Sequence, residues 1–473
     1  MHANPTRPET DMRLIAQHGP TNPVNFSRLK KYHIVLAGTI FTFNSALGSS
    51  LPSGASTEIA SAFGLTGDDT LLVLLNSLYL VGFALGPLIF GPLSEHLGRQ
   101  PVLIGTYIGY TLFTMACALA PTYPALLVLR LLCGIHAAAP NAVLGGLYSD
   151  IYNDPVQRGT AMGFFMFMTT LGPQAGPIIS GFATRVSWQW VFWVALIIAG
   201  AGFPVVAFLP ETYGPVLLKR SKRSNPNIIP LDGGEDRDTK SSSASMASIF
   251  KRPFTMTVRE PILLLTSLYL ALVYGVLYLF FQAYPVVFQG LYGMSAGVGG
   301  LAFIPMMIGA VIAFCVFMWY SSFHNRALAA GQTWAMVEEH RRLPLACLGA
   351  PAIVVSLFWL GWTSYSFIHP ILPMIAGLFF AIGFLLIFIA MINYLTDTYQ
   401  QSSASAQAAA STIRSITAVC LPLATGSMYG NLGIYWASSL LAFIALGMAV
   451  IPFAFIKYGA WLRRKSRYSG RIG

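Results

Sequence analysis

The chain has 473 residues, of which 55% are hydrophobic and only 10% are charged. Soluble domains carry about 25% charged residues, so this composition excludes an ordinary soluble enzyme. The mean hydropathy of +0.63 also excludes a disordered chain, because disordered segments have low hydrophobicity. The formal net charge of +11 indicates nucleic-acid binding only where basic residues cluster on one folded face, so the positions of the 28 Lys and Arg residues decide its meaning.

Long apolar stretches in two groups of six fill most of the chain. A helix needs about 20 apolar residues to cross the hydrocarbon core of a membrane. The predicted spans are 34–56, 71–92, 102–120, 125–148, 157–182, 190–209, 262–288, 297–319, 345–366, 371–395, 403–425 and 433–456. Membrane-spanning β-strands would alternate apolar and polar residues in segments of about ten, so a barrel is excluded. We therefore predict an all-α integral membrane protein with 12 transmembrane helices in two six-helix bundles.

Polar segments divide the chain into five parts. We expect an N-terminal tail over 1–33, a first bundle over 34–209, a linker loop over 210–260, a second bundle over 261–456 and a C-terminal tail over 457–473. No apolar core precedes the first span, so we expect an uncleaved signal anchor. Three serines at 241–243 lie among mixed charges, which is typical of a flexible linker and permits phosphorylation.

The basic residues lie almost entirely on one side of the predicted membrane. With the N-terminus placed inside the cell, 25 of the 28 Lys and Arg residues fall in the tails, the linker and the inner loops. Arg185 lies outside, and Arg130 and Arg414 lie within spans. The positive-inside rule then places both termini and the linker in the cytoplasm. Basic groups at span ends attract anionic lipid, so the charge predicts contact with the bilayer and no nucleic-acid partner.

A tight turn between the second and third spans reads GPLSEHLGRQP at 91–101. Gly91 allows close helix approach and Gly98 permits the reversal, while Glu95 and Arg99 can form ion pairs that close the inner end of a bundle. At this position the sequence resembles the major facilitator superfamily, whose signature here is G-x-L-[S/A]-[D/E]-x-x-G-R-[R/K]-P. Gln100 replaces the usual second basic residue, which weakens one cytoplasmic contact of the family.

The resemblance implies two bundles related by an axis along the membrane normal, with a substrate site at the midplane. It also implies a cytoplasmic gate formed by the turn. Asp150 and Arg158, near the inner ends of spans 4 and 5, are predicted to belong to that gate.

Arg130 in span 4 is followed four residues later by Gly134. A charged residue inside a span is costly and usually functional. Its alternative role is to extend its side chain to the outer headgroups. Antiporters of the superfamily carry R-x-x-x-G here, and the resemblance assigns Arg130 to proton transfer or to its electrostatic support.

Span 5 contains GPQAGP at 172–177. Gly172 and Gly176 allow close helix packing, and Pro173 and Pro177 remove backbone donors and bend the helix. This pattern looks like the antiporter signature, which in the family is associated with exporters rather than symporters. Further segments closely resemble fungal members of the 12-spanner drug:proton antiporter family. They are DPVQRG at 154–159, WQWVFW at 188–193, PETY at 210–213, NYLTD at 393–397, SA at 403–404 and RS at 414–415.

The candidate substrate contacts are aromatic or polar residues at depth. Tyr274, Tyr278 and Gln282 are spaced so that they share one helical face, with Phe281 nearby. The other candidates are Arg130, Asn44, His136, Gln174, Asn393 and Arg414. Four of these residues have an alternative role as hydrogen bonds between helices, namely Asn44, Gln174, Asn393 and Arg414. An aromatic cavity with a few polar groups suits amphipathic organic molecules.

None of the 17 acidic residues lies well inside a predicted span. A polyamine would need carboxylates to offset its desolvation, so neutral or weakly acidic lipophiles rank above polyamines as substrates. His136 is a candidate proton site because it is an imidazole, with a structural hydrogen bond as its alternative role, and Glu58 is a proton site only if span 1 starts deeper. Proton coupling therefore rests on the resemblance alone.

We predict a monomeric exporter of a lipophilic drug, toxin or secondary metabolite, acting in the plasma membrane by alternating access. It is expected to need no bound cofactor and to use the proton gradient as its energy source. The alternatives are an uptake symporter of the same fold, a polyamine exporter, a vacuolar location and a non-transporting receptor or membrane enzyme. His, Cys and acidic residues are never grouped within the predicted spans, so neither an enzyme active site nor a metal site is predicted.

Overall fold

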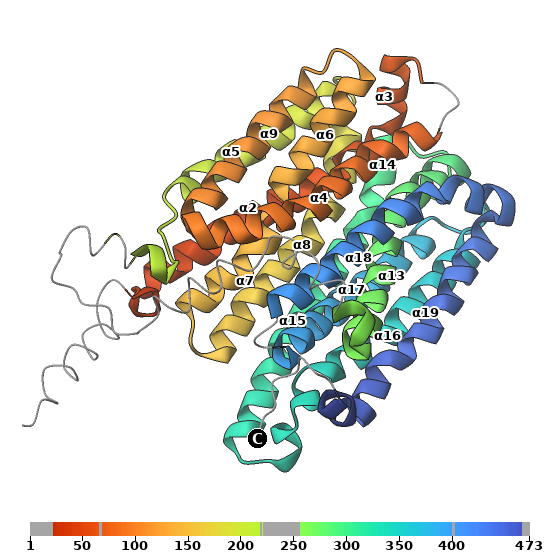
Figure 1. Ribbon diagram of the computed structural model, residues 1–473. Coiled ribbons are helices and arrows are strands. Elements are labelled where there is room, and N and C mark those ends of the chain that lie inside the picture. Colours follow the sequence, from red (N-terminus) through yellow and green to blue (C-terminus); the bar gives the residue numbers. More distant parts are fainter. Residues whose placement is uncertain (1–21, 66–68, 218–219, 221–255, 400–402, 466–473) are drawn as a thin grey trace, which may run out of the picture.

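The computed structural model describes residues 22–65, 69–217, 220, 256–399 and 403–465. Within these ranges every regular element is a helix (Figure 1). The serines at 241–243, most of the predicted linker, most of the predicted N-terminal tail and residues 466–473 of the predicted C-terminal tail lie outside the described residues. Ten helical segments of the described chain are long and apolar enough to cross a membrane, so this is a multi-pass membrane protein.

The first bundle contains six membrane-crossing units, drawn from red to yellow-green in Figure 1. They are α2 (Arg28–Ser50), α4 (Asp69–Leu97), α5 (Arg99–Ala118), α6 with α7 (Tyr123–Ala137 and Ala139–Ile151), α8 (Pro155–Ala183) and α9 (Gln189–Ala207). A 3₁₀ turn over Leu51–Gly54 and the short helix α3 (Ser56–Phe63) follow α2.

The second bundle contains the other six units, drawn from green to blue. They are α13 (Pro261–Tyr284), α14 with α15 (Ala296–Gly300 and Ile304–Ala329), α16 (Glu338–Thr363), α17 (Ile371–Thr398), α18 (Ser403–Leu423) and α19 (Thr425–Lys465). A π-helical turn over Pro285–Leu291 extends α13. The predicted fold class, 12 helices in two bundles of six, is confirmed.

Two of the twelve membrane-crossing helices are less apolar than the others. The sequence of α8 is rich in Gly, Pro and Thr, and the first half of α18 is rich in Ala, Ser and Gln. Small and weakly polar residues permit close contact between helices but lower the hydropathy. These two helices complete the twelve units beside the ten apolar segments.

Two predicted spans differ from continuous helices. The single helix predicted over 125–148 is two helices that meet at Ala138, because Pro140 in the first turn of α7 cannot donate a backbone hydrogen bond to α6. The boundary predicted between 425 and 433 is a kink inside α19, where Gly433 has a φ of 72°. Only glycine adopts that conformation readily, so the chain bends there without a loop.

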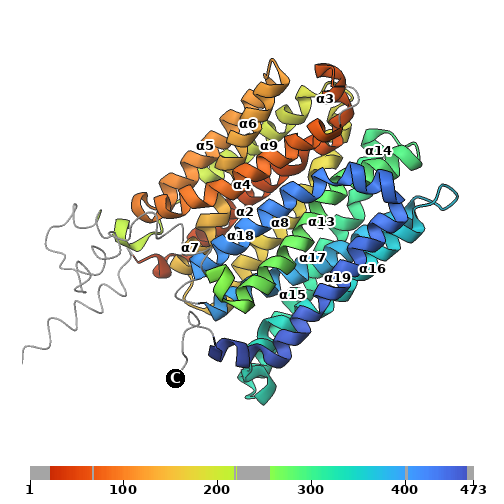
Figure 2. The same cartoon turned by 45° about the vertical axis from the view of Figure 1, so that its right-hand side comes forward.

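The helices run between two sides of the molecule (Figure 2). We call the side where α2 begins and α19 ends the terminal side, and the opposite side, where α3 and α14 lie, the far side. The buried core is continuous across the two bundles, which are joined where α8 packs against α15 and where α4 packs against α18.

Candidate translocation site between the bundles

One face of α8 lies against the second bundle. Phe167 stacks on Phe314 of α15, with ring centroids 4.7 Å apart. Nearer the far side, a Cβ on Gly181 would lie only 2.6 Å from the carbonyl oxygen of Ala296. These residues are spaced as neighbours on one helical face, so that face follows the seam between the bundles.

Gln174 lies on this same face of α8, seven residues after Phe167 and seven before Gly181. Its side chain is fully buried, and neither its amide nitrogen nor its amide oxygen has a hydrogen-bond partner among the described residues. A buried amide without partners is costly. A polar ligand in the seam would supply the missing partners, and the role of Gln174 as a substrate contact stays a prediction.

The glycines of the GPQAGP motif face the opposite way, toward α2. A Cβ on Gly172 would lie 2.8 Å from the backbone nitrogen of Leu47, and a Cβ on Gly176 would lie 3.1 Å from that of Leu51. The hydroxyl of Ser50 donates a hydrogen bond to the carbonyl oxygen of Pro173 at 2.6 Å. The predicted close packing of the motif is therefore confirmed.

Pro177, the last residue of the motif, also reaches the second bundle. A Cβ on Gly300 would lie 2.7 Å from the Pro177 carbonyl oxygen. The motif thus holds α8 against α2 with one face and places a backbone-to-backbone contact across the seam with another.

Aromatic residues of α13 face the seam from the second bundle. The hydroxyls of Tyr274 and Tyr278 lie 3.3 Å apart, and Tyr278 donates a hydrogen bond to Ser49 Oγ of α2 at 2.7 Å. Phe281 contacts Tyr278, with ring centroids 5.4 Å apart. All three aromatic residues are buried, whereas Gln282 is half-buried on the adjoining face. The structure therefore brings the predicted aromatic cluster to the seam.

Arg414 lies beside this cluster, halfway along α18. Its guanidinium carbon is 5.0 Å from the ring centroid of Tyr274 and 5.3 Å from that of Phe388. One guanidinium nitrogen donates to Ser411 Oγ at 3.3 Å, while the buried Nε has no partner among the described residues.

Arg130 lies inside the first bundle instead of extending to the headgroups. It is 2% exposed, its Nε donates to the carbonyl oxygen of Leu75 at 3.1 Å, and its guanidinium lies 4.4 Å from the ring centroid of Tyr79. The buried Nη2 has no partner in the described part of the chain. A cation at this depth without a carboxylate is stabilised by the ring and the backbone dipole.

Three other predicted substrate contacts form hydrogen bonds inside their own bundles. Asn44 donates to Ile40 and to the Tyr107 hydroxyl, and Asn393 donates to Ile389. His136 bonds the Leu132 carbonyl through Nδ1 at 2.9 Å and lies between aromatic rings of α4 and α5. A Cβ on Gly109 would occupy the place of this imidazole, so the ring fills a notch in α5. The structure does not bring these three side chains together at the seam.

The predicted gate lies at the terminal side of the first bundle. Arg99 Nε is 3.5 Å from Asp150 Oδ2, and its Nη1 donates to Ser94 Oγ at 2.6 Å. The ion pair expected of Arg99 is therefore present, whereas Glu95 is exposed at the end of α4 and belongs to none of the ion pairs between described residues. Gly91 is half-buried with Ala142 nearby, and Gly98 has a φ of 104°.

The second bundle repeats this ion pair at the corresponding place. Arg342 Nε, at the start of α16, is 3.3 Å from Asp397 Oδ2 at the end of α17. Arg463 at the end of α19 also binds Glu338 and Glu339 in the first turn of α16. Tyr399 donates to Glu260 Oε2 at 3.2 Å, and burial, with the neighbouring Glu260 carboxylate, raises the pKa of this phenol so that it stays a donor.

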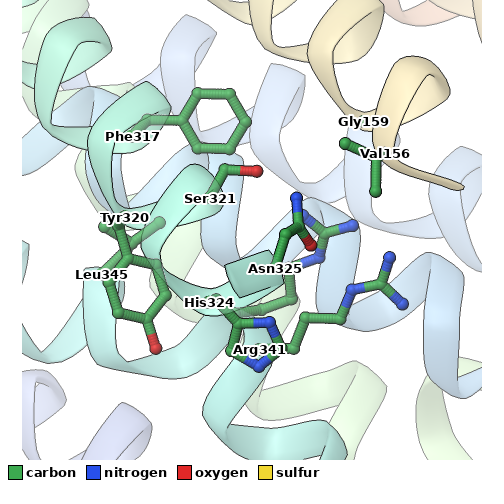
Figure 3. Close-up of a pocket in the computed structure, with 10 residues that line it drawn as sticks. Val156, Gly159, Phe317, Tyr320, Ser321, His324, Asn325, Arg341 and Leu345 are labelled. Carbon is green, nitrogen blue, oxygen red and sulfur yellow. The ribbon is translucent and has the colours of Figure 1, made fainter. Parts of the chain in front are cut away.

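A small cavity lies at the terminal end of the seam. Figure 3 shows Val156 and Gly159 of α8 on one side of it and Ser321, His324 and Arg341 of the second bundle on the other. The predicted gate residue Arg158 is half-buried in the same turn of α8. Basic groups of both bundles therefore meet at this end.

Comparison with known proteins places this architecture in a family. The model of the Major Facilitator Superfamily matches residues 38–418. The chain belongs to the major facilitator superfamily. Superfamily proteins transport solutes, so the chain is a membrane transporter rather than an enzyme.

Similar members of the superfamily occur in fungi. The MFS-type efflux pump MFS2 of Trichophyton rubrum is 39% identical over 457 residues, which cover 95% of this chain and 76% of that protein. Efflux pump FUBT of Fusarium oxysporum is 37% identical, covering 93% and 75%. The multidrug transporter mdrA of Aspergillus fumigatus is also 37% identical, covering 96% and 75%.

A solved superfamily structure shows the same fold. The proton:xylose symporter XylE bound to 6-bromo-6-deoxy-D-glucose has a TM-score of 0.66 at 17% identity, covering 92% of this chain and 96% of that one. At this identity the likeness concerns the fold alone.

Glu211 is a residue of this superfamily member whose role the sequence did not reveal. Its buried carboxylate accepts hydrogen bonds from the backbone N–H groups of Arg99, Gln100, Thr212 and Tyr213. A Cβ on Gly98 would lie 2.8 Å from the carboxylate carbon, so glycine is required beside it. The motif PETY at 210–213 was a signal, but only the fold shows that its Glu caps α5.

Proposed function

We propose that this superfamily member is a secondary active exporter of lipophilic small molecules. It binds its substrate between the two bundles and releases it on the other side of the membrane in exchange for protons. The observation that carries the proposal is the similarity, over more than nine-tenths of the chain, to proteins named efflux pumps. The buried aromatic cluster and the unpaired Gln174 at the seam support a site for amphipathic molecules.

Alternating access requires the seam to open on one side at a time. On the far side, the backbone contacts of Gly181 and Gly300 and the bond from Tyr278 to Ser49 join the bundles. These contacts have to separate when the site opens to the far side. One hydrogen bond contributes about 1 kcal/mol, so the free energy needed to break the bond between Tyr278 and Ser49 is small enough for the binding of a proton or a substrate to offset it.

The terminal side is proposed to be cytoplasmic and the membrane to be the plasma membrane. Basic residues at this side, such as Arg158, Arg341 and Arg463, agree with the positive-inside rule. The monomer is the proposed working unit, since both halves of the site come from one chain.

Proton coupling is proposed to pass through the surroundings of Arg130. The buried guanidinium of Arg130 has no carboxylate partner among the described residues, so it repels any further positive charge that enters the bundle. The entry of a proton near Arg130 is therefore the step that the proton gradient would drive. The acidic groups of the described helices lie at their ends, as Glu58, Glu260 and Asp397 illustrate. This arrangement disfavours a polyamine as the substrate.

The experiment that tests export is an accumulation assay in cells. Cells that produce the protein and cells that lack it are loaded with a panel of fluorescent lipophilic compounds. Producing cells are expected to retain less of at least one compound, and an ionophore that abolishes the proton gradient is expected to remove the difference. Higher retention in producing cells would instead indicate uptake, and a difference that survives the ionophore would exclude proton coupling.

A further inference from the structure

Arg414 is a cation at mid-membrane depth without a carboxylate. None of the ion pairs between the described residues includes it. A charged side chain inside a membrane bundle is costly and usually marks a ligand or ion pathway. Arg99 and Arg342, by contrast, have Asp150 and Asp397 as partners at the edge of the membrane.

The guanidinium retains unused capacity to donate hydrogen bonds. Its buried Nε has no partner in the described chain, and its bond to Ser411 is long at 3.3 Å. The faces of two aromatic rings, those of Tyr274 and Phe388, stabilise the positive charge. They do not replace the oxygen acceptors that the guanidinium N–H groups need. A planar group with two oxygen atoms fits a guanidinium of this kind, because both oxygens can accept hydrogen bonds in parallel.

The position of Arg414 is suited to a ligand in the seam. Tyr274, over which it lies, connects through Tyr278 to Ser49 of the first bundle. Tyr274 is 4% exposed and Phe388 is 3% exposed, whereas Arg414 on top of them is only half-buried. The accessible part of this cluster is therefore Arg414, and the rings of Tyr274 and Phe388 pack directly beside its guanidinium.

We propose that Arg414 binds the carboxylate of an aromatic monoacid, and that such acids are the preferred substrate class of this transporter. The inference deepens the proposed export function and rests on it. The single charge matches a monoanion, and the aromatic rings of Tyr274 and Phe388 beside the guanidinium favour a ligand whose uncharged part is aromatic. A cationic substrate at the same place would meet an unscreened like charge.

Binding to the purified full-length chain in lipid nanodiscs tests the proposal. The probes are 2-naphthoate and 2-naphthamide, which share ring and shape but differ in charge at pH 7. The readout is the quenching of tryptophan fluorescence. Charge-assisted hydrogen bonds contribute about 1.5–3 kcal/mol, so the acid is expected to bind about ten- to a hundredfold tighter than the amide.

Variants of Arg414 test whether this residue causes the preference for the acid over the amide. Arg414→Gln is expected to weaken binding of the acid to the level of the amide and to leave the amide unchanged, while Arg414→Lys retains part of the preference. The control Arg326→Gln removes an exposed arginine at the end of α15 and is expected to behave as the wild type. If Arg414→Gln does not fold, the wild-type ratio and the lysine variant decide.

The outcomes separate the two proposals. Equal affinity of the wild type for acid and amide, or an unchanged preference in Arg414→Gln, would overturn the role of Arg414. Binding of the acid through Arg414 without gradient-driven movement of it supports Arg414 as the carboxylate site but contradicts both export and the acids as substrates. Gradient-driven export of neutral compounds without any preference for acids supports export and overturns the inference.

Discussion

Glu211→Gln is expected to destabilise the terminal side of the first bundle. In the wild type, Oε1 accepts the N–H groups of Arg99, Thr212 and Tyr213 at 2.9 Å each, and Oε2 accepts that of Gln100 at 3.3 Å. An amide keeps one acceptor oxygen but turns a donor toward the N–H of Gln100. It also loses the negative charge at the N-terminus of α5.

The magnitude follows from these contacts. The lost bond and the opposed donors cost about 1–3 kcal/mol, and the lost charge at the helix terminus costs about 0.3–1 kcal/mol. Weaker bonds to the three remaining N–H groups add about 1 kcal/mol in total. The free energy of unfolding is therefore expected to fall by about 2–5 kcal/mol.

The apparent Tm of the purified protein, followed with a thiol-reactive dye that reports on the buried Cys117 and Cys133, measures this loss. Glu211→Gln is expected to lower it by several degrees, because a change of 1 kcal/mol shifts the Tm of a large domain by about 2 °C. The control Glu95→Gln, at an exposed position, is expected to change it by less than about 1 °C. Equal Tm values for both variants would refute the capping role.

Three further changes test the seam and the first bundle. Gly176→Ala places a methyl group against α2 and is expected to lower expression and transport severalfold, whereas Gly200→Ala, with open space around it, is expected to be neutral in the same assays. Tyr278→Phe removes the bond to Ser49, worth about 1 kcal/mol, and is expected to shift the population about fivefold toward the far-side-open state, measured as labelling of a cysteine placed in the seam. Arg130→Ala is expected to abolish transport while surface expression is retained, and full activity would contradict its role in coupling.

The architecture could be predicted from the sequence because the bilayer imposes it. Apolar stretches long enough to cross a membrane have to form helices, and small residues such as Gly172 and Gly176 can only indicate close packing. The breaks in the helices could not be predicted from hydropathy. Pro140 divides a unit that hydropathy joins, and the segment before Gly433, which hydropathy leaves between two spans, is the first part of α19, because an apolar window does not detect backbone geometry.

The partners of polar residues could not be predicted from spacing. Arg99 pairs with Asp150 rather than with the nearby Glu95, because the turn at Gly98 directs its side chain toward α7. The sequence places His136 and Asn44 deep in their spans, but depth does not show which way a helix face points. Gln174 and Arg414 differ from them only in what surrounds them in three dimensions.

Proton movement in reconstituted liposomes tests the central claim most directly. Liposomes that contain the purified protein and a pH-sensitive dye are loaded with an accepted substrate and diluted into substrate-free buffer. Exchange of substrate for protons predicts that the interior acidifies as the substrate leaves, and that Arg130→Ala abolishes the change. An interior that becomes more alkaline would indicate symport, and substrate efflux without any pH change would contradict proton coupling altogether.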